Sequence, residues 1–307
     1  MIVSAPSAVA QSEVAAKPIV GLRDNRPRDF ALQHATVIVS PGETVEDATV
    51  LISGSAIIGV GEDIEVPAGF MEVDCTDKRI YPGLIDAYSE IDVPAPATEA
   101  AHWNEYVTPQ RSAAAVATNE IAKADKLRGQ GITLRLVAPQ GGIVKGSSAV
   151  VMLGGESAGQ KLLKEQAWQH LKLTVPRGSS RAKYPNSPMG AVALLRQSMY
   201  DANWYRQAWS AYVADSSLPR PETNVALDHL SRAIGNDVFV VDAPNERMAI
   251  RAGRIADEFS LQMMIRGSGR EYRQLDQIAE LNRPILLPVN FPAPPDVTTG
   301  EEARNTS

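Results

Sequence analysis

The side-chain types that most often bind metals or act as nucleophiles are sparse in this sequence. It has four histidines, His34, His102, His170 and His229, and a single cysteine, Cys75. No histidine has a partner at a metal-ligand spacing. We therefore interpret each as a surface or packing residue. The lone cysteine excludes both an internal disulfide and a cysteine-rich metal site.

A glycine-rich segment is a second candidate for chemistry. Residues 141–147 read G-G-I-V-K-G-S, which superficially resembles a phosphate-binding loop. In that motif the lysine follows the last glycine, whereas Lys145 precedes Gly146. A hairpin that leads into a strand at 149–153 is the better interpretation. The sequence has no G-x-G-x-x-G motif.

Composition narrows the class of protein. The chain has 307 residues, of which 44% are hydrophobic and 21% charged, as in ordinary globular proteins. The formal net charge of -6 is spread without long basic blocks, so no nucleic-acid-binding face is expected. No apolar run approaches the roughly 18 residues of a membrane span.

The two ends of the chain are polar or proline-rich. Residues 1–30 are predicted to form a disordered arm, and residues 296–307 a disordered tail. Residues 8–10, A-V-A, have the form of a signal-peptidase site, but a charged start and an apolar run do not precede them. A flexible arm is the favoured interpretation. If the arm is instead a truncated signal peptide, the protein is exported or periplasmic; otherwise it is cytoplasmic.

The elements between these ends fall into two groups. Short β-branched runs about ten residues apart, separated by turns, predict a small antiparallel sheet or sandwich over 31–82. The runs are 36–39, 49–52, 57–60 and 71–73. After Asp86, helices alternate with strands, as in a parallel α/β domain. The expected helices are 112–128, 157–171, 189–213, 249–259 and 272–281; the expected strands are 132–137, 149–153, 238–241, 261–265 and 285–287.

A motif joins the two groups. Residues 66–74 read V-P-A-G-F-M-E-V-D, and residues 81–86 read Y-P-G-L-I-D. The second matches the start of P-G-x-I-D-x-H-x-H, the entry motif of the amidohydrolase superfamily. Residues 131–133, G-I-T, resemble the opening of that family's second barrel strand, and residues 238–288 are similar to its imidazolonepropionase-like branch. The resemblance covers about 31–295. It implies a composite β-sandwich at 31–82 and, at 83–295, an incomplete (β/α)8 TIM-type barrel of about seven strands.

The same resemblance identifies former metal-ligand positions. In the family, two histidines at i and i+2 of a strand share a face and hold zinc, which activates water. Here those positions are Tyr88 and Glu90, and the later histidine positions are Asp242 and Arg266. Each placeable histidine is replaced, so no metal is expected. Mg²⁺ or Mn²⁺ would suit Glu90 and Asp242, with Asp92, if these acids bind an ion.

Two facing acids need a counter-charge. Glu90 and Asp242 alone would repel each other in a partly buried barrel mouth. We hypothesise that the guanidinium of Arg266 lies between them in place of the metal, with Tyr88 hydrogen-bonded nearby. The alternative is a set of unrelated polar residues at strand ends. His102 lies in the loop expected to border this mouth.

The resemblance leaves three functions open. The first is a metal-poor homologue that binds a small molecule without hydrolysing it. The second is an active hydrolase of non-peptide C–N bonds in which Glu90 and Asp242 are catalytic. The third is a fragment that needs a complementary C-terminal part, because the family's eighth strand and its aspartate are not found. An unclosed barrel has open edges, so self-association is expected.

Overall fold

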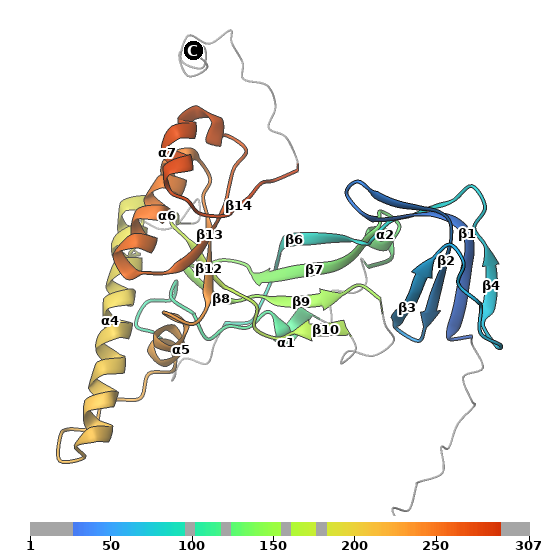
Figure 1. The fold of residues 1–307 in the computed structure, drawn as a ribbon. Coiled ribbons are helices and arrows are strands. Elements are labelled where there is room, and N and C mark those ends of the chain that lie inside the picture. The colour runs from blue at the N-terminus through green and yellow to red at the C-terminus, as the bar shows by residue number, and fades with distance from the viewer. Residues whose placement is uncertain (1–26, 96–101, 118–123, 155–160, 176–182, 290–307) are drawn as a thin grey trace, which may run out of the picture. The chain divides into compact units, whose positions relative to one another are not determined.

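The computed structural model describes residues 27–95, 102–117, 124–154, 161–175 and 183–289 (Figure 1). The chain divides into two compact units, Met1–Pro82 and Gly83–Ser307. Residues 1–26, which carry the question of a signal peptide, and the expected tail at 296–307 lie outside the described residues. The arm was expected to extend to residue 30, but the first strand already begins at Asp29.

The first unit is built on one mixed sheet. Its strand order is β3-β2-β1-β4, and β5 also pairs with β1. β1 to β3 are antiparallel, whereas β4 and β5 run parallel to β1, so a purely antiparallel sheet is not what forms. Ala35, Val37, Ala48 and Val50 form its buried cluster. The strands are β1 (Asp29–Ser40), β2 (Glu43–Ser53), β3 (Ala56–Gly61), β4 (Met71–Asp74) and β5 (Arg79–Ile80).

The second unit contains a four-stranded sheet of order β10-β9-β7-β6. β6 and β7 are parallel, and β9 and β10 are antiparallel to their neighbours. Asp86 of the entry motif ties β6 to β7, because its Oδ2 accepts from Nε of Arg135 at 3.0 Å. The strands are β6 (Leu84–Ile91), β7 (Ile132–Pro139), β9 (Ala149–Met152) and β10 (Leu162–Lys164), with short helices α1 (Ala114–Ala117) and α2 (Ala124–Arg128).

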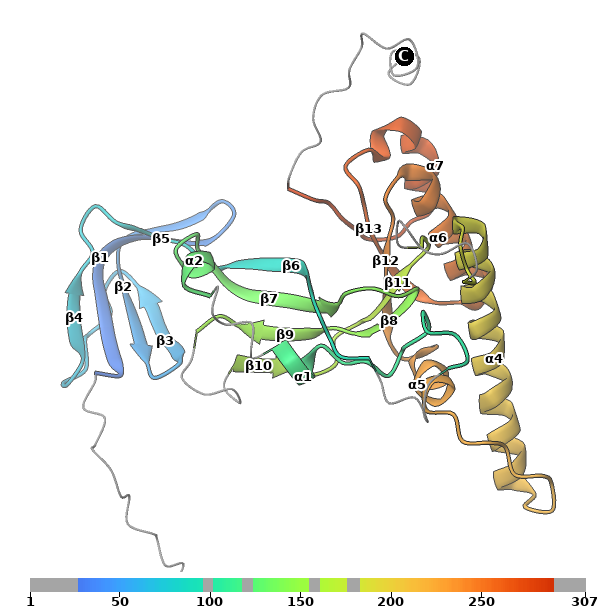
Figure 2. The ribbon, with the colours of Figure 1, turned by 180° about the vertical axis from the view of Figure 1, so that it is seen from behind.

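The second unit also contains a five-stranded sheet, of order β14-β13-β12-β11-β8. Only β8 is antiparallel to its neighbour. α4 and α6 lie on the same side of this sheet in both views (Figures 1 and 2). The strands are β8 (Val144–Ser147), β11 (Gln169–Lys172), β12 (Val238–Asp242), β13 (Gln262–Arg266) and β14 (Ile285–Leu286); the helices are α4 (Pro188–Ala214), α5 (Val225–Ala233), α6 (Glu246–Phe259) and α7 (Leu275–Glu280), which follows a 3₁₀ turn, Glu271–Gln274.

The largest core lies between this sheet and its helices. Leu171, Phe239 and Val241 from the strands pack with Leu194 and Leu230 from α4 and α5. Local signals delimit α6: the side chain of Asn245 accepts from the N–H of Met248, and Ser260 ends the helix in the left-handed region at φ 53°. The strands of this sheet, including their carboxyl ends, are therefore held in place by close packing against the helices.

Several expectations need correction. The helix predicted at 157–171 is wrong in its described part, where β10 and β11 form instead. These segments pair with distant strands, and such pairing overrides local periodicity. The hairpin predicted to lead into 149–153 does form, because β7 and β9 are antiparallel partners, but its connection contains a further strand, β8, which pairs with β11. The incomplete barrel of about seven strands is not confirmed, because in the described part of the chain the strands of the second unit form two separate sheets. Parallel strand-helix alternation does hold from β12 to β14. None of the described helices is long and apolar enough to cross a membrane.

Candidate functional site

The former metal-ligand positions lie at strand positions that face one another. Tyr88 and Glu90 are two residues apart on β6 and share a face, as strand geometry requires. Asp242 and Arg266 are the last residues of β12 and β13, and they are register partners. A hydrogen bond from the hydroxyl of Tyr88 to Asp242 joins β6 to β12. The structure therefore brings all four positions together.

A lysine lies at the centre of this group. The side chain of Lys145, from β8, is 0% exposed. Its Nζ lies 2.5 Å from Oε1 of Glu90 and 3.1 Å from Oδ2 of Asp242. Nζ also lies 2.8 Å from the hydroxyl of Tyr88. An ammonium has three N–H donors, so these three acceptors satisfy it completely.

Tyr88 links the two acids to each other. Its hydroxyl oxygen lies 2.9 Å from Oε1 of Glu90 and 3.2 Å from Oδ2 of Asp242. Burial, reinforced by the negative charges of Asp242 and Glu90, raises the pKa of Tyr88 far above its ordinary value. The phenol is therefore neutral, and it accepts from Lys145 while donating to a carboxylate.

Glu90 is ionised in this setting. Burial acts to raise the pKa of Glu90, but the charge of Lys145 and hydrogen bonds from Lys145 and Tyr88 outweigh it. The net result is a pKa below the usual value for glutamate. The side chain is 29% exposed, whereas that of Asp242 is only 7% exposed. Glu90 is thus the acid of the pair that solvent or a ligand can reach.

Arg266 pairs with only one of the two acids that it was expected to bridge. Nη1 of Arg266 lies 3.5 Å from Oδ1 of Asp242, but among the described residues no ion pair joins it to Glu90. Its guanidinium instead lies over the ring of Tyr88, 4.1 Å from the centroid. Lys145 is the side chain that contacts both acids. The expected hydrogen bonding of Tyr88 is confirmed.

His170, which sequence reasoning placed in a helix, lies on β11 behind Tyr88. The two ring centroids are 5.6 Å apart. Both ring nitrogens are buried and have no hydrogen-bond partner in the described part of the chain. Burial, followed by repulsion from Lys145, lowers the pKa of His170 to about 3. The imidazole is therefore neutral at physiological pH.

The other histidines do not join this group. His102 is buried, and its Nδ1 accepts from the backbone N–H of Asn104 at 3.1 Å. Burial lowers the pKa of His102. It lines a separate pocket of about 620 Å³ with Asp92 and Arg111. Asp92 is thus not part of the cluster around Lys145.

The residues present do not fit the zinc ion of the family's sites. Among the described residues no group of three or more histidines, cysteines and acids is arranged to hold a metal. The oxygen donors are two carboxylates and a neutral phenol, and Lys145 contacts all three. A divalent cation within about 2.0–2.6 Å of both carboxylates would lie against the lysine ammonium. The ammonium of Lys145 therefore occupies the position between the acids that a metal ion would need.

A pocket of about 500 Å³ opens above the cluster. It lies at the carboxyl ends of parallel strands, where α/β proteins commonly bind ligands. Its volume is within the usual range for small molecules. The lining residues are Glu90, Lys172, Asp242, Ala243, Pro244, Arg266, Gly267, Ser268, Arg270 and Pro288.

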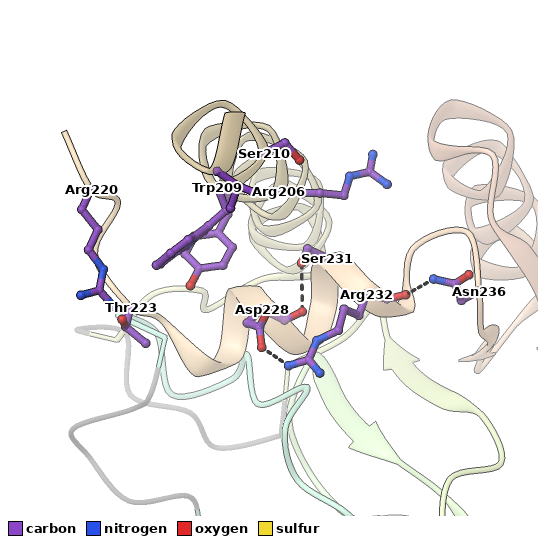
Figure 3. A pocket seen from close by; sticks show the side chains of 11 residues that line it. Arg206, Trp209, Ser210, Arg220, Thr223, Asp228, Ser231, Arg232 and Asn236 are labelled. Atoms are coloured by element: carbon purple, nitrogen blue, oxygen red, sulfur yellow. Dashed lines mark hydrogen bonds and ion pairs between the residues drawn. The ribbon is translucent and has the colours of Figure 1, made fainter. Parts of the chain in front are cut away.

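A larger pocket, of about 790 Å³, lies between α4 and α5 (Figure 3). Figure 3 shows Asp228 paired with Arg232, which lies one helical turn away. The guanidinium of Arg220 lies 5.6 Å from the ring centre of Trp209. This pocket contains no strand-end residue, and its acid already has a partner. It is therefore a weaker candidate for chemistry than the pocket above Lys145.

Comparisons with known proteins support the fold. Neither a protein-family model nor a curated protein matches the chain. The crystal structure of an amidohydrolase from Thermotoga maritima MSB8 is similar, with a TM-score of 0.70 and 22% identity over 85% of this chain and 70% of that one. A putative prolidase from Bifidobacterium longum (TM-score 0.37, 14% identity, 83% and 52% covered) and a D-hydantoinase from Thermus sp. (0.27, 13%, 78% and 57%) are too distant to carry an argument. The structural resemblance to amidohydrolases is thus confirmed for the fold.

Proposed function

We propose that this chain is an amidohydrolase-superfamily protein that binds a small molecule without hydrolysing it. The observation that carries the proposal is the buried ammonium of Lys145, which contacts Glu90, Tyr88 and Asp242. In a hydrolase of this family, a metal among such groups would activate water and polarise a carbonyl. An ammonium whose three donors are engaged does neither.

Under this proposal Glu90 and Asp242 are binding and structural groups, not catalytic ones. Oε1 of Glu90 is engaged by Lys145 and Tyr88. The partial exposure of Glu90 allows its other carboxylate oxygen to accept a hydrogen bond from a ligand. Asp242 is almost fully buried and holds Lys145 in place.

We also propose that the two sheets of the second unit are parts of one barrel wall. Two observations support this: β6 and β7 are parallel, and so are β11 to β14. Among the described strands β6 and β14 would be the edges of such a wall, and we propose that copies of the chain associate through them. Light scattering at several protein concentrations tests this self-association, and a monomer at every concentration would contradict the self-association.

The experiment on function compares metal binding and turnover. Protein dialysed against a chelator is titrated with Zn²⁺ and Mn²⁺ by calorimetry, and then assayed with a dipeptide, a lactam and a cyclic imide. We expect no stoichiometric metal binding and no turnover. Glu90→Gln and the surface control Glu62→Gln should behave alike in both assays. Metal-dependent turnover that Glu90→Gln abolishes, and Glu62→Gln does not, would show an active hydrolase instead.

A further inference from the structure

Three basic side chains line the strand-end pocket. Lys172 and Arg266 are the last residues of β11 and β13, on either side of Asp242 on β12. Arg270 is exposed in the loop after β13. Since neighbouring parallel strands end at one edge of the sheet, these cations converge on one space.

The acids of the pocket do not neutralise these cations. Lys145 already contacts both Glu90 and Asp242. Counting Lys145, the lining has four cationic and two anionic side chains, and Glu271, which accepts from the lining residue Ser268, lowers the net charge of the site to +1. No acidic partner for Lys172 or Arg270 is found in the described ranges. Such a positive pocket attracts anions.

Arg266 is held in a position suited to binding an anion. Its guanidinium stacks on the ring of Tyr88 and makes only a long contact of 3.5 Å with Asp242. Its side chain is 42% exposed, so N–H donors remain available to a ligand. A stacked guanidinium matches the two oxygens of a carboxylate or phosphate.

The inference drawn from these observations rests on the metal-free binding site proposed above and adds the chemical class of its ligand. We propose that the ligand of this pocket carries an oxyanion group, a carboxylate or a phosphate, bound by Arg266, Arg270 and Lys172. The pocket of about 500 Å³ sets the size of the ligand at that of a small metabolite.

Calorimetry on chelator-treated protein tests the proposal with three probes: inorganic phosphate, succinate, and succinamide as the neutral analogue of succinate. We expect saturable binding of at least one anion and none of succinamide. Lys172→Gln and Arg270→Gln should each weaken anion binding about tenfold, as expected for the loss of one charge-assisted hydrogen bond. Arg254→Gln, an exposed charge on α6 outside the pocket lining, should leave it unchanged.

The outcomes separate the sources of the oxyanion. Binding of phosphate alone identifies a phosphate group, and binding of succinate alone identifies a carboxylate. The proposal is overturned if neither anion binds, if succinamide binds as well as succinate, or if Arg254→Gln weakens binding as much as Lys172→Gln does. Unfolding curves of all three variants serve as the control that each variant is folded.

Failure here is distinct from failure of the proposed function. Metal-dependent hydrolysis would refute the proposed non-hydrolytic function. The calorimetry would still show whether anion binding needs Lys172 and Arg270. Anion binding that is indifferent to both residues would refute the ligand class alone.

Discussion

Replacing Lys145 by methionine removes the cation while keeping most of the volume of its side chain. Glu90 and Asp242 would then face each other across Tyr88 without the ammonium that contacts both. Arg266 cannot take over from its present position, since its only contact with the acids is at 3.5 Å from Asp242. We therefore expect Lys145→Met to be strongly destabilising.

The magnitude follows from burial. Lys145 is 0% exposed and Asp242 is 7% exposed, so water cannot replace the lost contacts without a change of structure. Removing one partner of a buried ion pair costs about 3–5 kcal/mol. With an m-value of about 2.5 kcal/mol per molar urea, the unfolding midpoint should fall by about 1.2–2 M.

The loss should depend on pH in one direction. In the native protein the pKa of Glu90 is held below its usual value, so Glu90 contributes stability at neutral pH that is lost as pH falls through the folded-state pKa. Lys145→Met removes the charge and the hydrogen bond of Lys145 that lower the pKa of Glu90, so that burial, opposed only by the hydrogen bond from Tyr88, raises it. The gap between native protein and variant should therefore be largest near neutrality and shrink in acid.

Urea unfolding followed by circular dichroism, at neutral and acidic pH, measures both effects. Lys126→Met, an exposed substitution on α2, is the matched control and should change stability by no more than about 0.5 kcal/mol. The triple variant Lys145→Met, Glu90→Gln, Asp242→Asn should recover much of the loss, because no buried charge is left unpaired. A Lys145→Met midpoint equal to that of Lys126→Met would refute the buried ion-pair cluster.

Two further predictions concern β8 and the strand beside it. Gly146→Ala should lower the unfolding free energy by roughly 1–3 kcal/mol, because φ is +112° and a Cβ would lie 2.9 Å from the carbonyl carbon of Arg111. At the control position, Gly154, a Cβ would meet open space, so Gly154→Ala should leave the unfolding free energy nearly unchanged in the same urea assay. In the native protein the pKa of His170 lies at about 3, so below pH 6.5 the imidazole binds a proton in the unfolded chain but not in the folded one. The variant His170→Phe removes this imidazole. The native protein should thus lose stability as pH falls from 6.5 toward 3, by up to about 1.4 kcal/mol per pH unit, and the variant should lose less; identical pH profiles would contradict a buried, neutral His170.

The sequence predicts the local part of this site well. The period of a strand places Tyr88 and Glu90 on one face, and the buried apolar run before Asp242 predicts a strand that ends there. The likeness of Y-P-G-L-I-D to a known entry motif predicts the fold, and Asp86 of that motif does hold β6 to β7 through Arg135. Each inference depends on residues close together in the sequence.

The central cation could not be found in this way. Lys145 is 55 residues from Glu90 and 97 from Asp242. Glycines beside it favour a turn, and only its pairing with β11 makes the segment a fully buried strand. One signal was present: a lysine directly after Ile143 and Val144 breaks an apolar run. A charge inside an apolar segment needs a buried partner, and the two unpaired acids inferred from the motif were suitable partners.

The chemistry of the site follows from which cation holds its acids together. The ammonium of Lys145 offsets part of the negative charge of Glu90 and Asp242 and contacts the hydroxyl of Tyr88. A metal keeps a coordination position for water or substrate, whereas the ammonium of Lys145 has only three donors and all are engaged. On this basis we propose that the site does not activate the water that would attack an amide. Under the proposal made above, the pocket binds a ligand without hydrolysing it, and the basic residues at its rim select an anion.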